Sequence, residues 1–397
     1  MLAFSSFEYF VRARGEAIYL LFPVVTFIFF YSKQKFDFIV LKFILPFVFV
    51  FLVQSLFYGS QFSWSITLGI RLITMYFCAK IIGKDFIKIF IETLKVIAII
   101  SLVFYVFQYI GPTYSFMMSL SNKITSLGIR SESINVDVLR PNFIIYVMSV
   151  KLEGFNVYRN SGAFWEPGLY VIFLNIAFFL NMFITKKIIN KTNLIFIIAI
   201  LTTFSTNGFI VILMSLALFT SINKSVSLPV KILLFTFLIG VLPAIMALPF
   251  MSKKVDDQFN QSDISYSRFG AAVVHYNIVK DYPLTGMPWS EETYLKYADN
   301  ISPNGITVIF VRYGLIAGII YYILLFRLCS TIMALFGKRN SGFALFLVLV
   351  VSNFGQTTGN SPIYWTFIFS QIPLNTYVIQ WGKIQKFKMY NYFLKGV

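Results

Sequence analysis

The chain lacks the charge and the metal-binding side chains that many soluble enzymes use. Only 12% of its 397 residues are charged, whereas a soluble domain carries roughly a quarter. Two cysteines and one histidine are too few for a disulfide framework or a Cys/His metal cluster. The sequence also has no glycine-rich phosphate loop with lysine and no Ser-His-Asp set. These shortages exclude a water-soluble globular fold, and we expect neither a metal nor another cofactor.

Apolar residues are abundant instead. They make up 58% of the chain, its mean hydropathy is +0.76, and a helix of about 20 apolar residues crosses a bilayer. Apolar segments fall at 17–32, 38–58, 64–82, 89–111, 164–185, 192–206, 208–222, 230–250, 304–327, 341–354 and 362–380. The sequence therefore predicts an all-α polytopic membrane protein with about eleven transmembrane helices (roughly 10–12).

The net charge of +17 is spread between the apolar segments, so we predict no nucleic-acid partner. Basic residues occupy alternate short connections and the C-terminal tail: Lys33, Lys35, Lys80, Lys84, Lys88, Lys186, Lys187, Lys191, Lys224, Lys231, Lys338, Arg339, Lys383, Lys386 and Lys388. The opposite connections, at 59–63, around Asn207 and at 355–361, carry no Lys or Arg. The positive-inside rule places the basic set in the cytoplasm. The same alternation places the N-terminus outside despite Arg12 and Arg14, so either the helix count is off by one or the first residues lie along the interface.

Two long polar stretches divide the chain into parts. These parts are the N-terminal helices (1–111), a first outer loop (112–163), the central helices (164–250), a second outer loop (251–303), and the C-terminal helices with a cytoplasmic tail (304–397). Long loops translocate regardless of their charge. The central helices are broken near 205–208 by Ser-Thr-Asn-Gly, and short segments broken in this way usually line a cavity.

A dense polar cluster, Arg-Asn-Ser-Gly-Ala-Phe-Trp-Glu-Pro-Gly, runs from Arg159 to Gly168 and opens a membrane helix. Arg159 and Glu166 flank a glycine turn at Gly162. Pro167 fits the first helical turn, where its missing N–H loses no hydrogen bond. The helix dipole favours Glu166 as an anion. Two interpretations stay open: Glu166 takes part in chemistry, or it merely caps the helix.

The second outer loop contains a stretch with helical spacing, 267–281, which ends before Pro283. Arg268 and His275 are seven residues apart, so they share one face of this helix. A basic, histidine-bearing face could bind a phosphate and assist proton transfer. The alternative is a solvated surface helix whose histidine makes an ordinary hydrogen bond.

Two arginines, Arg71 and Arg312, lie inside apolar segments. At a rise of 1.5 Å per residue, both fall roughly 10–12 Å below the outer ends of their helices. An arginine at that depth is a functional-site hypothesis, because isolation in lipid costs several kcal/mol. We predict a cationic pocket open to the outer leaflet. The alternative is that both side chains extend to the interface.

The string from Arg159 to Gly168 resembles the O-antigen polymerase (Wzy-type) family of bacterial membrane proteins. A second set of residues is similar to the wider O-antigen ligase and polymerase superfamily: Ser267-Arg268, Tyr282-Pro-Leu-Thr-Gly286, Asn304, and Gly305 to Gly318. The break from Thr202 to Gly208 is similar to that superfamily's interrupted helix pair. The ligase branch carries a histidine shortly before the following helix, where this chain has Pro303 and Asn304. That departure argues against a lipid A-core ligase.

The resemblance implies a glycosyltransferase of the GT-C type in the bacterial inner membrane, with two large periplasmic loops. It would transfer the growing glycan from undecaprenyl pyrophosphate to a sugar hydroxyl of a new undecaprenyl-pyrophosphate-linked repeat unit, on the periplasmic face and without a metal. Expected partners are that lipid-linked oligosaccharide, the bilayer, a polysaccharide chain-length regulator and a flippase. The alternatives are a ligase-type glycan transferase and, from another class, a lipid-linked oligosaccharide flippase or transporter.

Site roles follow from the matched motifs and from the need for positive charge where pyrophosphate leaves. The catalytic candidates are Glu166 as the base, Arg159, Arg268, and His275, whose role is not assigned. The candidates for binding pyrophosphate or sugar are Arg71, Arg312, Arg140, Trp165 and Asn304, although Trp165 alone fits an interfacial anchor better than a sugar platform. The structural motif positions are Gly162, Pro167, Gly168 and Gly286.

Overall fold

The computed structural model describes residues 17–124, 146–147, 157–223, 226–229, 231–232, 236, 240, 267–288, 293, 296–297 and 304–394. Its elements in chain order are α3 (Ala17–Tyr31), α4 (Ile39–Tyr58), α5 (Phe62–Ile82), the 3₁₀ turn η1 (Gly83–Asp85), α6 (Phe86–Phe107), α7 (Gly111–Ile124), α8 (Pro167–Thr185), α9 (Lys191–Thr202), α10 (Thr206–Ile222), α13 (Arg268–Asp281), α15 (Val308–Leu335), the 3₁₀ turn η4 (Arg339–Ser341), α16 (Gly342–Asn353) and α17 (Pro362–Leu394). Each of the predicted apolar segments contains described helical residues, although 230–250 lies almost wholly outside the described part of the chain.

Within the described residues, four helical stretches are long and apolar enough to cross a membrane: Ile39–Tyr58, Phe62–Phe107, Pro167–Thr185 and Val308–Leu335. The apolar helices α3, α9 and α10 are shorter. Large apolar side chains stay exposed on the outer helices, among them Phe27, Phe49, Phe57 and Ile316. Such a surface suits lipid rather than water, so the chain is a helical, membrane-embedded protein.

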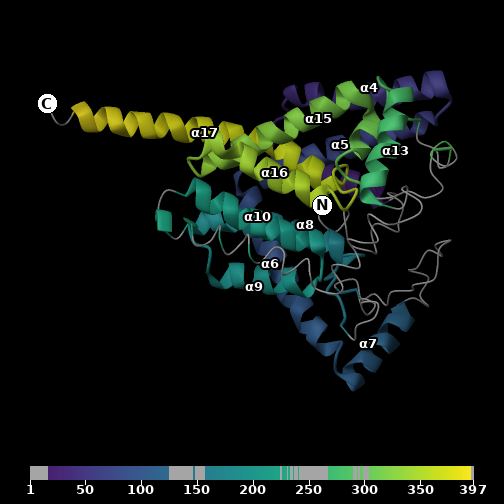
Figure 1. Cartoon of the computed structure of the whole chain (residues 1–397). Coiled ribbons are helices and arrows are strands. Elements are labelled where there is room, and N and C mark those ends of the chain that lie inside the picture. Colours follow the sequence, from purple (N-terminus) through teal and green to yellow (C-terminus); the bar gives the residue numbers. More distant parts are fainter. Residues whose placement is uncertain are drawn as a thin grey trace.

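Helix α8 lies near the centre of the bundle in Figure 1. It packs against α6, α9, α10 and α16, and every residue from Pro167 to Phe183 except Gly168 is buried. Gly208 of α10 allows a close approach, because a Cβ there would lie 2.4 Å from Cγ2 of Val171. Helix α16 also packs on α15, which contacts α4 and α17. Helix α8 is therefore enclosed by protein rather than by lipid.

Helix α15 is kinked at Gly314, whose φ of 72° lies outside the helical range. The backbone groups that the kink frees bind the segment that follows α13. The Met287 N–H donates to the carbonyl of Val311 at 2.7 Å, and the Leu315 N–H donates to the carbonyl of Pro283 at 2.8 Å. The segment 283–287 is thereby joined to an interrupted helix.

Two glycines make this junction possible. Gly286 has a φ of 69°, and a Cβ on it would lie 2.5 Å from the carbonyl oxygen of Val311. A Cβ on Gly314 would lie 2.4 Å from the carbonyl oxygen of Leu284. Both positions need glycine, because the backbone is left-handed and the two chain segments touch directly.

Gln54 of α4 completes the junction from the other side. Its Nε2 donates to the carbonyl of Thr285 at 2.7 Å and to the carbonyl of Arg312 at 3.1 Å. Gln54 is buried, so these bonds satisfy both its amide and the carbonyl that the kink leaves open. The Tyr-Pro-Leu-Thr-Gly motif at 282–286 is thus a structural element that holds the loop against α15.

Some boundaries differ from the prediction. The first outer loop, predicted from residue 112, opens with helix α7, because the α6 helix ends at Phe107 and a new helix starts at Gly111. The helix predicted from residue 304 begins at Val308, after a turn over 304–307.

The helix predicted in the second loop is confirmed as α13. Its start is fixed by Ser267, whose side-chain oxygen accepts a hydrogen bond from the Gly270 N–H at 2.8 Å. A serine at this position satisfies one of the open N–H groups of the first turn. In Figure 1, α13 lies beside α15, which it contacts.

Candidate functional site

Glu166 is the last residue before α8, with extended backbone angles (φ −149°, ψ 155°), and Pro167 takes the first helical position as predicted. Glu166 occupies the N-cap position, but its side chain makes no capping hydrogen bond to the described first turn. The carboxylate lies near Gly168, beside the side-chain amide of Gln356. A Cβ on Gly168 would lie 3.4 Å from Oε1 of Glu166 and 2.8 Å from Nε2 of Gln356. Glycine at this position leaves room for both polar groups.

Arg268, the first residue of α13, reaches the same place from the second half of the chain. Partial burial lowers the pKa of its guanidinium, while attraction to the carboxylate of Glu166 acts in the opposite direction. The guanidinium lies against Gly355, where a Cβ would come within 2.6 Å of Nη1. Because Gly355 immediately precedes Gln356, Arg268 and Glu166 meet over one short stretch of chain.

That stretch, residues 354–361 between α16 and α17, is referred to below as the polar loop. Four of its polar side chains are buried: Gln356, Thr358, Asn360 and Ser361. The sequence analysis used the absence of Lys and Arg in this loop to predict its side of the membrane. It did not predict that the loop contributes to the candidate site. An uncharged polar string between two apolar helices is itself a signal, because polar groups at that depth need partners.

Arg71 of α5 reaches the far end of the polar loop. Its Nη2 donates to the carbonyl of Asn360 at 2.5 Å. The side-chain Oδ1 of Asn360 accepts hydrogen bonds from Tyr313 at 2.5 Å and from the Trp365 indole at 2.9 Å. Arg71 also lies close enough to Arg312 for their charges to repel. The structure thus brings together the two arginines that the sequence placed at one depth.

His275 and Asn304 join α13 to the start of α15. The Nδ1 of His275 shares a hydrogen bond of 2.6 Å with the hydroxyl of Thr307. Asn304 donates from Nδ2 to the carbonyl of Arg268 at 3.0 Å and accepts from the Ile306 N–H at 3.1 Å. Burial lowers the pKa of His275 to about 4, so the ring is neutral at pH 7. These contacts favour a packing role for His275, which is buried rather than solvated, and a similar role for Asn304.

Arg159 lies at the break between α9 and α10, which spans 203–205 rather than 205–208. Its Nε donates to the carbonyl of Thr203 at 3.1 Å. The neighbouring Asn160 binds the end of α9 twice, through its N–H to the carbonyl of Thr202 at 2.8 Å and through Nδ2 to the Thr202 hydroxyl at 3.0 Å. The start of the motif therefore anchors to the broken helix pair, whereas its end carries Glu166.

Three further predicted positions are Gly162, Trp165 and Arg140. Gly162 has a φ of 57°, and a Cβ there would lie 2.9 Å from the Tyr170 ring, so glycine is required by both conformation and space. Trp165 is 40% exposed, as either an interfacial anchor or a sugar contact would be. Arg140 lies outside the described residues.

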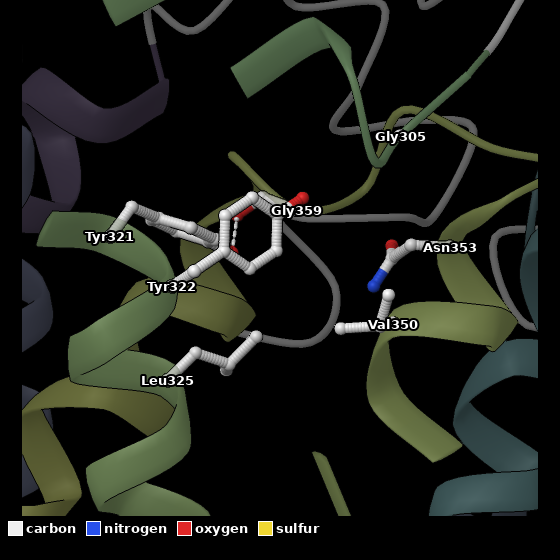
Figure 2. Close-up of a pocket in the computed structure, with 7 residues that line it drawn as sticks. All are labelled: Gly305, Tyr321, Tyr322, Leu325, Val350, Asn353 and Gly359. Carbon is white, nitrogen blue, oxygen red and sulfur yellow. Dashed lines mark hydrogen bonds between the residues drawn. The ribbon is translucent and has the colours of Figure 1, made fainter. Parts of the chain in front are cut away.

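A small cavity lies beside the polar loop, between α15 and α16 (Figure 2). Tyr321 and Leu325 of α15 face Val350 and Asn353 of α16 across it, and the Tyr321 hydroxyl donates to the carbonyl of Gly359 at 2.5 Å. Its volume of about 10 Å³ is enough for about one water molecule. It is too small to hold a sugar.

Around the polar loop the structure therefore gathers three guanidinium groups, those of Arg71, Arg268 and Arg312, and one carboxylate, that of Glu166. The excess of positive charge suits an anionic ligand, and the carboxylate can accept a proton. No protein-family model matches the sequence, and no curated protein matches it. Functional inference thus depends on these residues and their geometry.

Proposed function

We propose that the chain is a polysaccharide polymerase that joins lipid-linked repeat units on the periplasmic face of a bacterial inner membrane. The donor is the growing glycan on undecaprenyl pyrophosphate, and the acceptor is a sugar hydroxyl of a new lipid-linked unit. One observation carries the proposal: Glu166 and Arg268, which belong to the two motifs of the resemblance, interact across the polar loop. A proton acceptor beside a cation is the pair that this transfer requires.

The chemistry assigns a separate task to each group. Glu166 removes the proton of the acceptor hydroxyl while that oxygen forms a bond to the anomeric carbon of the donor sugar. The bond between this carbon and the phosphate oxygen breaks, and its electron pair leaves with the pyrophosphate. Arg268 stabilises the negative charge that develops on the leaving group, because a guanidinium makes strong charge-assisted hydrogen bonds to phosphate oxygens.

The membrane arrangement belongs to the same proposal. About eleven helices of a GT-C-like enzyme cross the bilayer, the C-terminal end of α17 is cytoplasmic, and both large loops are periplasmic. Substrates arrive on lipid, since nucleotide sugars do not reach that face. A flippase delivers the units, and a chain-length regulator acts beside the polymerase.

A ligase would use the same base and cation with another acceptor, whereas a flippase would need neither. Polymerase, ligase and flippase are distinguished by deleting the gene and resolving the surface polysaccharide on a gel. We expect the ladder to vanish while a single repeat unit remains on the lipid A core. Full-length glycan accumulating on undecaprenyl pyrophosphate would instead indicate a ligase, and unpolymerised units trapped on the cytoplasmic side would indicate a flippase.

A further inference from the structure

Arg71 is a half-buried cation whose hydrogen-bonding capacity is only partly used. It lies in the middle of the apolar helix α5, and its Nη2 is bound to the Asn360 carbonyl. Its Nε–H is buried, and within the described part of the chain it has no hydrogen-bond partner. A buried donor without an acceptor costs free energy, so this nitrogen points to an acceptor that the described residues do not supply.

The neighbour of Arg71 brings a second positive charge to the same place. The Coulomb interactions of Arg71 within the described residues come from Arg312, which repels it, and from the phenol of Tyr313. Two like charges in an apolar surrounding are unfavourable unless a negative group lies between them. The carbonyl of Asn360 holds Arg71, and the Tyr313 hydroxyl holds the side chain of Asn360. The Gln54 bond fixes the backbone of Arg312 at the kink of α15.

The anion that fits is a phosphate or pyrophosphate. It offers several oxygens around one centre, so two guanidinium groups can bind it from two sides at once. The depth of Arg71 and Arg312 in apolar helices favours a group attached to a lipid over a free ion in water.

We propose that Arg71 and Arg312 form a lipid-phosphate subsite, separate from the Glu166–Arg268 pair at the other end of the polar loop. Its assignment to a polyprenyl-linked substrate depends on the proposed function. Polymerisation uses two lipid-linked substrates at once. The leaving pyrophosphate of the donor must lie beside the base and therefore beside Arg268. The subsite at Arg71 and Arg312 then holds the pyrophosphate of the acceptor, which remains attached to its lipid and is remote from the reacting hydroxyl.

Native mass spectrometry of the purified full-length chain, titrated with undecaprenyl pyrophosphate, tests this subsite by counting bound lipids. We expect two lipids on the wild type. Arg71→Gln and Arg312→Gln should each bind one of the two about tenfold to one hundredfold more weakly, the effect of losing a charged hydrogen bond. Lys42→Gln is the matched control, because Lys42 is an exposed cation on α4, and it should leave both lipids bound.

The two arginine variants keep the test decisive if one of them fails to fold. The Arg312 carbonyl, rather than its side chain, is what Gln54 binds, so Arg312→Gln keeps that contact. Two lipids bound with unchanged affinity in a folded variant would overturn the subsite. Equal competition by phosphatidylglycerol would reduce it to a general anionic-lipid contact, and binding of inorganic pyrophosphate in preference to the lipid would overturn the lipid assignment.

Failure of the subsite and failure of the proposed function give different results. If Arg71→Gln loses a lipid but the wild type makes no polymer from lipid-linked units, the subsite stands and the polymerase assignment falls. If Arg71→Gln binds both lipids with wild-type affinity while wild-type membranes do make polymer, the polymerase assignment stands and the subsite is wrong.

Discussion

The carboxylate of Glu166 and the guanidinium of Arg268 come from opposite halves of the chain and attract one another beside Gly355. One belongs to the start of a buried helix and the other to the start of a loop helix, and the polar loop lies against both. The pair combines a proton acceptor with a stabiliser of negative charge. The first two predictions test each member of that arrangement.

Glu166→Gln should lower the rate of polymer formation by about 10²- to 10⁴-fold, the usual contribution of a general base. The measurement is the incorporation of labelled lipid-linked units by membranes that contain equal amounts of wild-type or variant protein. Glu92→Gln is the control, since Glu92 is an exposed carboxylate on α6 that pairs with Lys95. A wild-type rate in Glu166→Gln would remove Glu166 from the mechanism.

Gly355→Ala should slow polymerisation by displacing Arg268 without unfolding the protein. The new methyl group would come within 2.6 Å of Nη1, and the flexible arginine can move away. Misplacing a catalytic group by about 1 Å can cost about 10²-fold in rate, so we expect a loss of about tenfold to one hundredfold. Gly111→Ala, at a position with nothing within 4 Å, should retain full activity. Equal rates in both variants would mean that the Arg268 position does not matter.

Gly314→Ala should destabilise the fold more than Gly59→Ala, because Gly314 combines a positive φ with a ψ of 179°, a conformation that is essentially limited to glycine, and because its backbone touches the second loop. Both glycines have a positive φ, but a Cβ on Gly59 meets nothing within 4 Å, whereas one on Gly314 meets the Leu284 backbone. The left-handed conformation alone costs roughly 1–2 kcal/mol. Thermal unfolding in detergent should show that loss for Gly59→Ala and a larger one for Gly314→Ala. Equal shifts would show that the contact with the 283–287 segment is not tight.

His275 should make the fold less stable in acid without taking part in the reaction. Its pKa falls to about 4 in the folded chain, against about 6.5 in an unfolded one. The neutral ring therefore contributes stability that is complete above about pH 6.5 and is lost as pH falls toward 4. Between pH 7 and pH 5 the loss is about 2 kcal/mol.

Thermal unfolding from pH 7 to pH 5, compared between the wild type and His275→Gln, measures this effect. The variant should show a flatter dependence on pH and should still polymerise at pH 7, because glutamine can also bond to the Thr307 hydroxyl. Loss of polymerisation at pH 7 with the fold intact would show that His275 acts on the substrate.

The long apolar helices were predictable from sequence because each needs only a run of apolar residues, and α13 was predictable because Ser267 and Pro283 mark its ends. Helix α7, which lies in the predicted first loop, was not predicted. The kink of α15 was not predictable, since neither Gly314 nor the apolar segment around it carries a local signal for a bend. The helix is bent by contact with a loop about 30 residues earlier in the chain. Long-range contacts of this kind leave no local pattern.

The candidate site was predictable in part. Glu166, Arg268, Arg71 and Arg312 stand out as charges at helix starts or within apolar helices. The roles of Gln356 and Asn360 could not be predicted, because the role of an amide side chain depends on the residues that pack against it in the fold. The same reason applies to Asn304, which stays a predicted substrate contact and whose side-chain oxygen also accepts hydrogen bonds from the turn before α15.

The enclosure of α8 by other helices has a consequence for how the protein tolerates different membranes. Helices that face lipid tilt when the bilayer thickens or thins, but α8 contacts protein along almost its whole length. Glu166 stands at the start of that helix, and its position should therefore change little with lipid chain length or temperature. The proposed reaction on lipid-linked substrates would therefore take place at a site that the surrounding bilayer does not deform.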